Sequence, residues 1–175
     1  MNRFTINTQR LSLRQLTPDD AAFLVELMNE PPYLENIGDR GVRSVADSIR
    51  YIDEKYAPGY VRDGYGMYLA ELPNGAVPIG ICGLVKRSWL DQPDLGFAFL
   101  SRFWSNGYAT EEAEATLSHA KEALKLLYLY GVVSPKNTRS ISLLERVGFR
   151  HQPSLTFPGQ PPGTLLYRAA LRPMS

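Results

Sequence analysis

The chain has 175 residues, 44% of them hydrophobic and 21% charged, which is ordinary for a globular protein and sufficient for one domain over residues 1–175. Its formal net charge is +1 with both signs mixed along the chain, so charge gives no reason to expect nucleic acid or an anionic membrane as a partner. The lone cysteine, Cys82, excludes an internal disulfide and argues against a zinc cluster; with no apolar leader at residues 1–10 and no bilayer-spanning apolar run, we expect a cytoplasmic protein without a metal site.

The first half of the sequence predicts one strand followed by two helices. Residues 9–16 alternate leucine with polar side chains, as a strand does. Thr17 is followed by a proline and, three residues on, by an acid, which is typical of a helix start; Ser44 with Asp47 predicts a second one. Residues 29–41, between the two helices, contain two prolines and two glycines, so we expect a loop there.

The second half alternates strands with helices. Residues 77–85 are apolar on both faces, so we expect this strand at the centre of the sheet, joined to the preceding strand by an Asn-Gly turn. A long helix is expected from Tyr108 to about Leu124, and a short one from Asn137 to about Gly148. The element order β-α-α-β-β-β-α-β-α-β-β predicts a layered α/β fold. The other expected strands are at residues 66–72, 94–99, 126–133, 149–155 and 164–171, with a loop at 158–163.

The most informative stretch runs from Asp94 to Glu112, where a strand leads through a turn into the long helix. Gly107 stands where this helix opens, and the first N–H groups of a helix have no partner inside it. Together with the helix dipole they favour an anion, and a glycine lets a phosphate approach the backbone closely. The functional interpretation is a pyrophosphate site. For a lone glycine, an ordinary strand-to-helix turn is the commoner explanation.

Two motifs resemble those of the GNAT N-acetyltransferases. The run 104–111, Trp-Ser-Asn-Gly-Tyr-Ala-Thr-Glu, is similar to motif A of the RimJ/RimL branch, which acetylates protein N-termini. Gly107 and Ala109 match its two small positions, whereas the lysine often found before the first of them is absent here. Residues 137–140, Asn-Thr-Arg-Ser, followed by Gly-Phe at 148–149, resemble the N-x-x-S…GF signature of that branch. The resemblance covers nearly the whole chain.

This resemblance implies a mixed central sheet flanked by helices, whose two middle strands separate to admit acetyl-CoA as cosubstrate. The end of the strand at 94–99 would offer backbone groups to the pantetheine arm and to the thioester carbonyl, although Phe99 also fits plain core packing. Asn137 would bond to the same arm, with a helix N-cap as the alternative. The residues expected to bind acetyl-CoA are Phe99, Leu100, Trp104, Ser105, Asn106, Gly107, Tyr108, Ala109, Thr110 and Asn137.

Two residues are candidates for proton transfer. The resemblance gives Ser140 the role of protonating the leaving thiolate, and a serine that caps the helix or is solvated is an equal alternative. Asp94 stands where the branch often has an acid, and it could accept the amine proton, through water if needed. Cys82 lies in the most apolar strand, which favours a buried structural thiol over a ping-pong nucleophile.

The expected function is acetyl-CoA-dependent N-acetyl transfer to a protein or peptide N-terminal α-amine, by direct attack in a ternary complex. The alternatives are a small-molecule amine as acceptor (an aminoglycoside, a polyamine or an amino acid) and a non-catalytic CoA-binding sensor. The segments 29–41 and 155–163 are expected to flank the acceptor site. Edge-strand dimers are common in such folds, which makes a homodimer one option for assembly.

Overall fold

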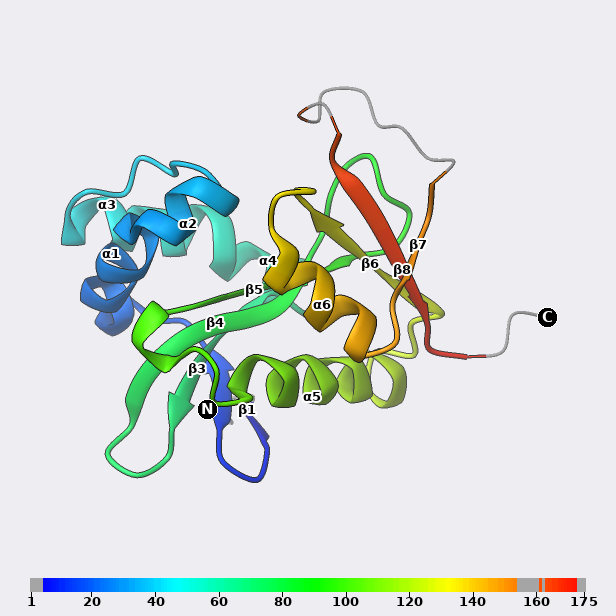
Figure 1. Ribbon diagram of the computed structural model, residues 1–175. Coiled ribbons are helices and arrows are strands. Elements are labelled where there is room, and N and C mark those ends of the chain that lie inside the picture. Colours follow the sequence, from blue (N-terminus) through cyan, green and yellow to red (C-terminus); the bar gives the residue numbers. More distant parts are fainter. Residues whose placement is uncertain (1–4, 154–160, 162, 173–175) are drawn as a thin grey trace.

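The fold is built on one mixed sheet of eight strands (Figure 1). The computed structural model describes residues 5–153, 161 and 163–172. Within them the strand order is β1-β2-β3-β4-β5-β6-β8-β7, and all neighbours are antiparallel except the parallel pair β5–β6. The strands are β1 Thr5–Asn7, β2 Ser12–Gln15, β3 Met67–Leu72, β4 Val77–Val85, β5 Asp94–Phe99, β6 Tyr128–Val133, β7 Arg150–His151 and β8 Leu165–Ala170.

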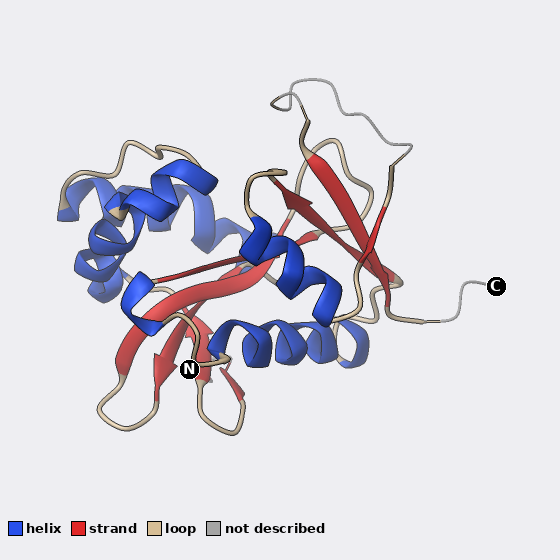
Figure 2. Ribbon diagram, viewed as in Figure 1, coloured by secondary structure: helices blue, strands red, loops and turns tan. Residues whose placement is uncertain are grey.

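Helices cover both faces of the sheet (Figure 2). They are η1 Pro18–Asp20, α1 Ala21–Asn29, α2 Pro31–Asn36, α3 Val45–Tyr51, η2 Ile52–Tyr56, α4 Ala57–Arg62, η3 Ser101–Phe103, α5 Tyr108–Glu122 and α6 Thr138–Arg146. Successive residues of β4 enter different cores: Ile81 packs with Leu24 and Leu27 of α1, whereas Cys82 packs with Ala113 and Ala120 of α5. Since neighbouring residues of a strand point to opposite faces, the helices α1 to α3 cover one face, and α5 and α6 cover the other. The mixed α/β fold predicted from the sequence is confirmed, with β4 in the interior of the sheet as expected.

Both predicted helix starts are present. The Ser44 hydroxyl accepts a hydrogen bond from the Asp47 N–H at 3.1 Å, and the Asp47 carboxylate accepts the Ser44 N–H at 3.0 Å. At the first helix the Asp20 carboxylate accepts the Thr17 N–H at 2.8 Å. Each pair satisfies N–H groups that would otherwise lack partners, so these short sequence signals fix where the two helical segments begin.

The segments before β3 differ from the prediction in two places. The strand expected at 9–16 is shorter, and it pairs with an additional strand, β1. The segment 29–41, expected to be a loop, contains helix α2. Pro31 and Pro32 occupy the first positions of that helix, where a missing N–H costs nothing, so these prolines start a helix instead of preventing one.

The second helical segment contains a π-helical turn. The α3 helix continues through η2 into α4 and ends at Arg62. Within it the Ala57 N–H donates to the Ile52 carbonyl, five residues back. The next residue, Pro58, has no N–H and cannot continue a regular α-helical ladder, which explains why the turn widens here. Near the C-terminus the strand expected at 149–155 is limited to β7 among the described residues, and most of the loop expected at 158–163 lies outside them.

The parallel strands β5 and β6 meet at one end and then separate. Their register consists of Asp94 opposite Tyr130, and the Tyr130 N–H donates to the Pro93 carbonyl at 3.0 Å. By contrast, β5 pairs with β4 along its whole length, and β6 with β8 along its whole length. The sheet is therefore split between its two middle strands, as the family resemblance implied.

Candidate active site

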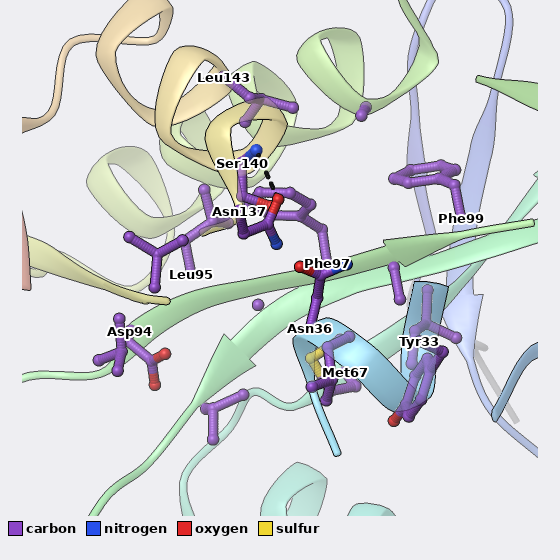
Figure 3. Close-up of a pocket in the computed structure, with 18 of the residues that line it drawn as sticks. Tyr33, Asn36, Met67, Asp94, Leu95, Phe97, Phe99, Asn137, Ser140 and Leu143 are labelled. Atoms are coloured by element: carbon purple, nitrogen blue, oxygen red, sulfur yellow. Dashed lines mark hydrogen bonds between the residues drawn. The ribbon is translucent and has the colours of Figure 1, made fainter. Parts of the chain in front are cut away.

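A cleft of about 1230 Å³ opens at the split between β5 and β6. Figure 3 shows β5 running between two groups of side chains. Asn137, Ser140 and Leu143 of α6 lie on one side of the strand, and Tyr33 and Asn36 of α2 lie on the other. The cleft thus has two sides that share one strand as a floor. We call them the α6 side, which includes the N-terminus of α5, and the α2 side.

The N-terminus of α5 forms an anion-binding turn on the α6 side. Gly107 is the N-cap and has a left-handed conformation with φ of +80°, where a side chain would be strained. No side chain caps this helix, and the first α-helical bond runs from the Glu111 N–H to the Gly107 carbonyl at 3.1 Å. The N–H groups of residues 108–110 therefore have no acceptor inside the helix. This turn has the chemistry that a pyrophosphate requires, and residues 104, 105 and 107–110 line the cleft.

Asn106 supports this turn without lining the cleft. Its side-chain amide donates to the carbonyls of Phe103 and Trp104 at 3.1 and 3.0 Å. Its own carbonyl accepts the Arg10 guanidinium at 2.9 Å, and Arg10 also pairs with Glu111 at 2.6 Å. Asn106 and Arg10 therefore hold the shape of the turn. No local pattern could indicate Arg10, because it lies about a hundred residues earlier in the chain.

A cation stands beside the turn in place of the missing lysine. The Arg139 guanidinium carbon lies 4.8 Å from the centroid of the Trp104 ring, and both residues line the cleft. Such stacking holds the guanidinium by a cation–π interaction. Arg139 was visible in the sequence only as a variable position of the N-x-x-S motif, yet it brings positive charge to the anion-binding turn.

The pairing of β5 decides which backbone groups face the split. The Leu100 N–H donates to the Ile79 carbonyl of β4 at 3.0 Å, and the Leu100 side chain is fully buried. Along an antiparallel pair, the N–H and C=O groups of successive residues point alternately toward the partner strand and away from it. Since Leu100 bonds to β4, the backbone groups of Phe97 and Phe99 point away from β4 and toward the cleft. The Phe99 carbonyl accepts the Trp104 indole N–H at 2.8 Å, which leaves the N–H groups of Phe97 and Phe99. Leu100 was predicted to bind acetyl-CoA, but its N–H is already bonded to β4. Phe97 replaces it as a candidate for donating a backbone hydrogen bond to acetyl-CoA.

Asn137 and Ser140 lie together at the start of α6, as predicted. The Asn137 side-chain oxygen accepts the Ser140 N–H at 3.1 Å, so Asn137 is the N-cap of the helix (Figure 3). Both residues line the cleft, and Leu144 on the same helix anchors α6 in the core. The cap uses only the oxygen of Asn137, so its amide N–H groups remain able to donate into the cleft.

Asp94 is held by a partner that the sequence did not indicate. Its carboxylate accepts two hydrogen bonds from Arg87, at 2.9 and 3.1 Å, and only 1% of the residue is exposed. Burial raises the pKa of Asp94, and the Arg87 charge opposes that rise. The pair lies at the closed end of the cleft, where β5 still contacts β6. Its role as proton acceptor, directly or through water, stays a prediction.

The α2 side of the cleft carries a group of tyrosines. Tyr33 of α2 lies with Tyr51 and Tyr56 in one core cluster, and the rings of the latter two pack edge-to-face with centroids 5.2 Å apart. Burial raises the pKa of Tyr33 to about 12 and also raises the pKa of Tyr56, so both phenols keep their protons at neutral pH. The sequence predicted that residues 29–41 flank the acceptor site but did not single out Tyr33, because the prolines and glycines there indicated a loop. It gave no signal for Tyr51 and Tyr56 either, which lie in the next helical segment.

Cys82 lies outside the cleft. It is fully buried on β4, its sulfur is 3.6 Å from the Thr116 hydroxyl oxygen, and burial raises the pKa of the thiol. A buried, protonated thiol cannot reach a thioester, which supports the structural interpretation. In the part of the chain that the structure describes, no group of three or more His, Cys, Asp and Glu side chains could hold a metal ion. Within the same residues, no helix combines the length and the apolar character needed to cross a membrane.

Comparison with known proteins agrees with this geometry. The family model described as Acetyltransferase (GNAT) domain matches residues 10–150. The uncharacterized protein YkkB of Bacillus subtilis (strain 168) is 27% identical over 154 residues, covering 85% of this chain and 86% of YkkB.

Solved structures show the same fold. An acetyltransferase from Agrobacterium tumefaciens str. C58 has a TM-score of 0.81 at 26% identity, covering 96% of this chain and 95% of that one. The structure of AAC(6')-Ib in complex with paromomycin and acetyl-CoA has a TM-score of 0.73 at 20% identity, over 93% and 94% of the two chains. Because the family model spans most of the sequence and the split sheet and anion-binding turn agree with it, the chain belongs to the GNAT acetyltransferase family, whose cosubstrate is acetyl-CoA.

Proposed function

We propose that this N-acetyltransferase acetylates the α-amine of a protein or peptide, by direct attack of the amine on acetyl-CoA in a ternary complex. The observation that carries the proposal is the two-sided cleft, in which the side with the anion-binding turn and the α2 side share the strand β5. Both reactants fit in such a cleft at once, and holding them together removes much of the entropic barrier to their reaction. Direct attack also agrees with the burial of Cys82, which excludes it as an acetyl carrier.

On the α6 side, the proposed site binds the cosubstrate through backbone and charge. The N–H groups of residues 108–110 would hold the pyrophosphate, with Arg139 supplying positive charge beside them. The pantetheine arm would lie along the free edge of β5, next to the amide of Asn137. When bound, acetyl-CoA supplies an activated acetyl thioester. The N–H groups of Phe97 and Phe99 would stabilise the negative charge that develops on the thioester oxygen.

Two proton transfers complete the proposal. Ser140 is the candidate acid for the departing thiolate, since its hydroxyl lies on the α6 side near Asn137 (Figure 3). Asp94 is the candidate proton acceptor, acting through water because Arg87 occupies its carboxylate directly. If Asp94 titrates in the reaction, Asp94→Asn lowers kcat and removes the acidic limb of the pH–rate profile. An unchanged profile would leave the Asp94–Arg87 pair a purely structural role.

The fold by itself does not choose the acceptor. Structures that share it include a putative ribosomal-protein-serine acetyltransferase from Vibrio cholerae at 22% identity and a spermidine N-acetyltransferase chimera at 16%. Likeness at this level concerns the fold alone. The α-amine proposal is instead supported by the RimJ/RimL-like motifs at 104–111 and 137–140.

The test is acetyl-CoA-dependent thiol release with matched acceptors. One peptide has a free α-amine and no lysine, and its control has a blocked N-terminus and one lysine. We expect release with the first peptide only, with mass spectrometry locating the acetyl group on the α-amine. Release with small amines but not with peptides would overturn the peptide acceptor. Binding of CoA without release from any amine would indicate a sensor and overturn the enzyme mechanism.

A further inference from the structure

Arg40 lies among the tyrosines on the α2 side of the cleft. It follows α2 in the chain, lines the cleft together with Tyr33 and Tyr56, and its guanidinium donates a hydrogen bond to the Ile37 carbonyl at 3.4 Å. Its charge opposes the rise in the pKa of both phenols. Tyr51 lines the cleft beside them and packs against Tyr56. This group, which we call the Tyr–Arg cluster (Tyr33, Arg40, Tyr51 and Tyr56), presents phenol O–H groups and one guanidinium. It contains no carboxylate, so it offers hydrogen-bond donors and positive charge together.

Most acidic side chains that line the cleft near this cluster already form ion pairs with basic side chains of the same chain. Asp63 pairs with Arg62 at 2.6 Å and with Lys86 at 2.8 Å, and its side chain is 5% exposed. Asp94 pairs with Arg87 in the same way. Within the described residues, Arg40 and Lys55 form no ion pair, and both line the cleft. Glu35 is an exposed acid that also lines this side. A polycationic acceptor would therefore find few free carboxylates and several cations on this side.

The chemistry of the cluster matches an anion. A guanidinium and phenol O–H groups all donate hydrogen bonds, and charge-assisted bonds from such donors to a carboxylate are among the strongest in proteins. We propose that the Tyr–Arg cluster is a subsite for a carboxylate of the acceptor, so that the substrate is an amine that also carries a carboxylate. This inference rests on the acetyltransferase function proposed above, and it names the class of acceptor that the α2 side selects.

The carboxylate has two sources, and matched acceptors separate them. Serine compared with serinamide tests the α-carboxylate of a free amino acid. Two C-terminally amidated peptides, Ser-Glu-Ala-Ala and Ser-Gln-Ala-Ala, test an acidic side chain next to the reacting α-amine. Spermidine and kanamycin represent polycations. Thiol release with saturating acetyl-CoA gives kcat/KM for each, and we expect a preference of about 10-fold or more for the carboxylate in at least one matched pair.

The variants make the assignment specific. Arg40→Gln should bring the preferred ratio close to one, and Arg40→Lys should restore part of the preference. Tyr33→Phe should lower the preference without removing it. Arg50→Gln is the matched control, because Arg50 is an exposed arginine of α3 that does not line the cleft, and the ratio should stay unchanged.

The outcomes separate this inference from the function on which it rests. Equal kcat/KM within both pairs, a higher kcat/KM for spermidine or kanamycin, or an unchanged ratio in Arg40→Gln would overturn the carboxylate subsite while acetyl transfer stands. Release with serine but with neither peptide would overturn the peptide acceptor proposed above and keep the carboxylate subsite. Absence of thiol release with every acceptor would overturn the proposed function, and the inference would fall with it.

Discussion

Glu112 offers a sharp test of how the helix beneath the active site is stabilised. It lies in α5 and is 0% exposed, and neither of its carboxylate oxygens has a hydrogen-bond partner among the described residues. Burial raises the pKa of Glu112 well above its usual value, and the neighbouring charge of Glu111 adds to the rise. The folded protein therefore favours the protonated acid, whereas the unfolded chain ionises it near its ordinary pKa.

The change Glu112→Met replaces two unpartnered oxygens with an apolar side chain of similar length. An unsatisfied buried polar group costs roughly 1–3 kcal/mol, so we expect the free energy of unfolding at neutral pH to rise by about that amount. For a chain of this size each kcal/mol raises Tm by about 2–4 °C. Glu112→Gln should gain less, because it removes the ionisation but keeps the polar groups. Glu114→Met is the control, since Glu114 is exposed on the same helix and its loss should have little effect.

The sign of the pH dependence follows from the raised pKa. Stability from protonated Glu112 is fully present below the unfolded pKa of about 4.3 and is lost as pH rises through the folded pKa. The advantage of Glu112→Met over the wild type should thus be smallest near pH 4 and grow toward neutral pH. Urea denaturation followed by circular dichroism at several pH values measures this. An unstabilised Glu112→Met, or an advantage independent of pH, would refute the reasoning and point to a water or a partner that holds the carboxylate.

The remaining predictions concern the candidate site. Gly107→Val should abolish CoA binding in calorimetric titration while costing the fold only about 1–2 kcal/mol or somewhat more through its left-handed backbone, and retained affinity would remove the turn from the site. Cys82→Ala should keep acetyl transfer within a few-fold, and an acetylated Cys82 in quenched samples would contradict direct attack. Ser140→Ala should lower kcat by about 10²-fold or more with KM for acetyl-CoA nearly constant, and full kcat would make Ser140 a bystander. Asn137→Ala should lower stability by about 0.5–2 kcal/mol, as loss of an N-cap does, and raise KM for acetyl-CoA in steady-state kinetics; an unchanged KM would limit Asn137 to capping.

Local signals account for the parts of the structure that the sequence predicted well. The pair Ser44–Asp47 fixes a helix start through bonds between residues three apart, and Gly107 marks a helix start through its own backbone conformation. The strand–turn–helix between Asp94 and Glu112 and the short helix after Asn137 follow from the same kind of short-range pattern. Such features need no knowledge of the rest of the fold.

What the sequence did not predict depends on contacts between distant segments. Whether Phe97 or Leu100 offers its N–H to the cleft is set by the register of β5 against β4, which no local pattern specifies. The pairing of Arg10 with Glu111 joins residues about a hundred positions apart. Tyr33 was not predicted as a site residue for a different reason, because Pro31 and Pro32 are typical of loops although here they open the helix that carries it.

The pairing of β5 with β6 at one register position has a mechanical consequence. The Asp94–Tyr130 pair is the place where two continuous ladders, β1 to β5 and β6 to β7, are joined edge to edge. A ligand that lies in the split contacts both ladders, so its binding free energy stabilises the state in which β5 and β6 are paired. Amide hydrogen exchange in β6 and β8 should therefore slow when the split is filled, while exchange in β3 and β4, already paired on both edges, changes little.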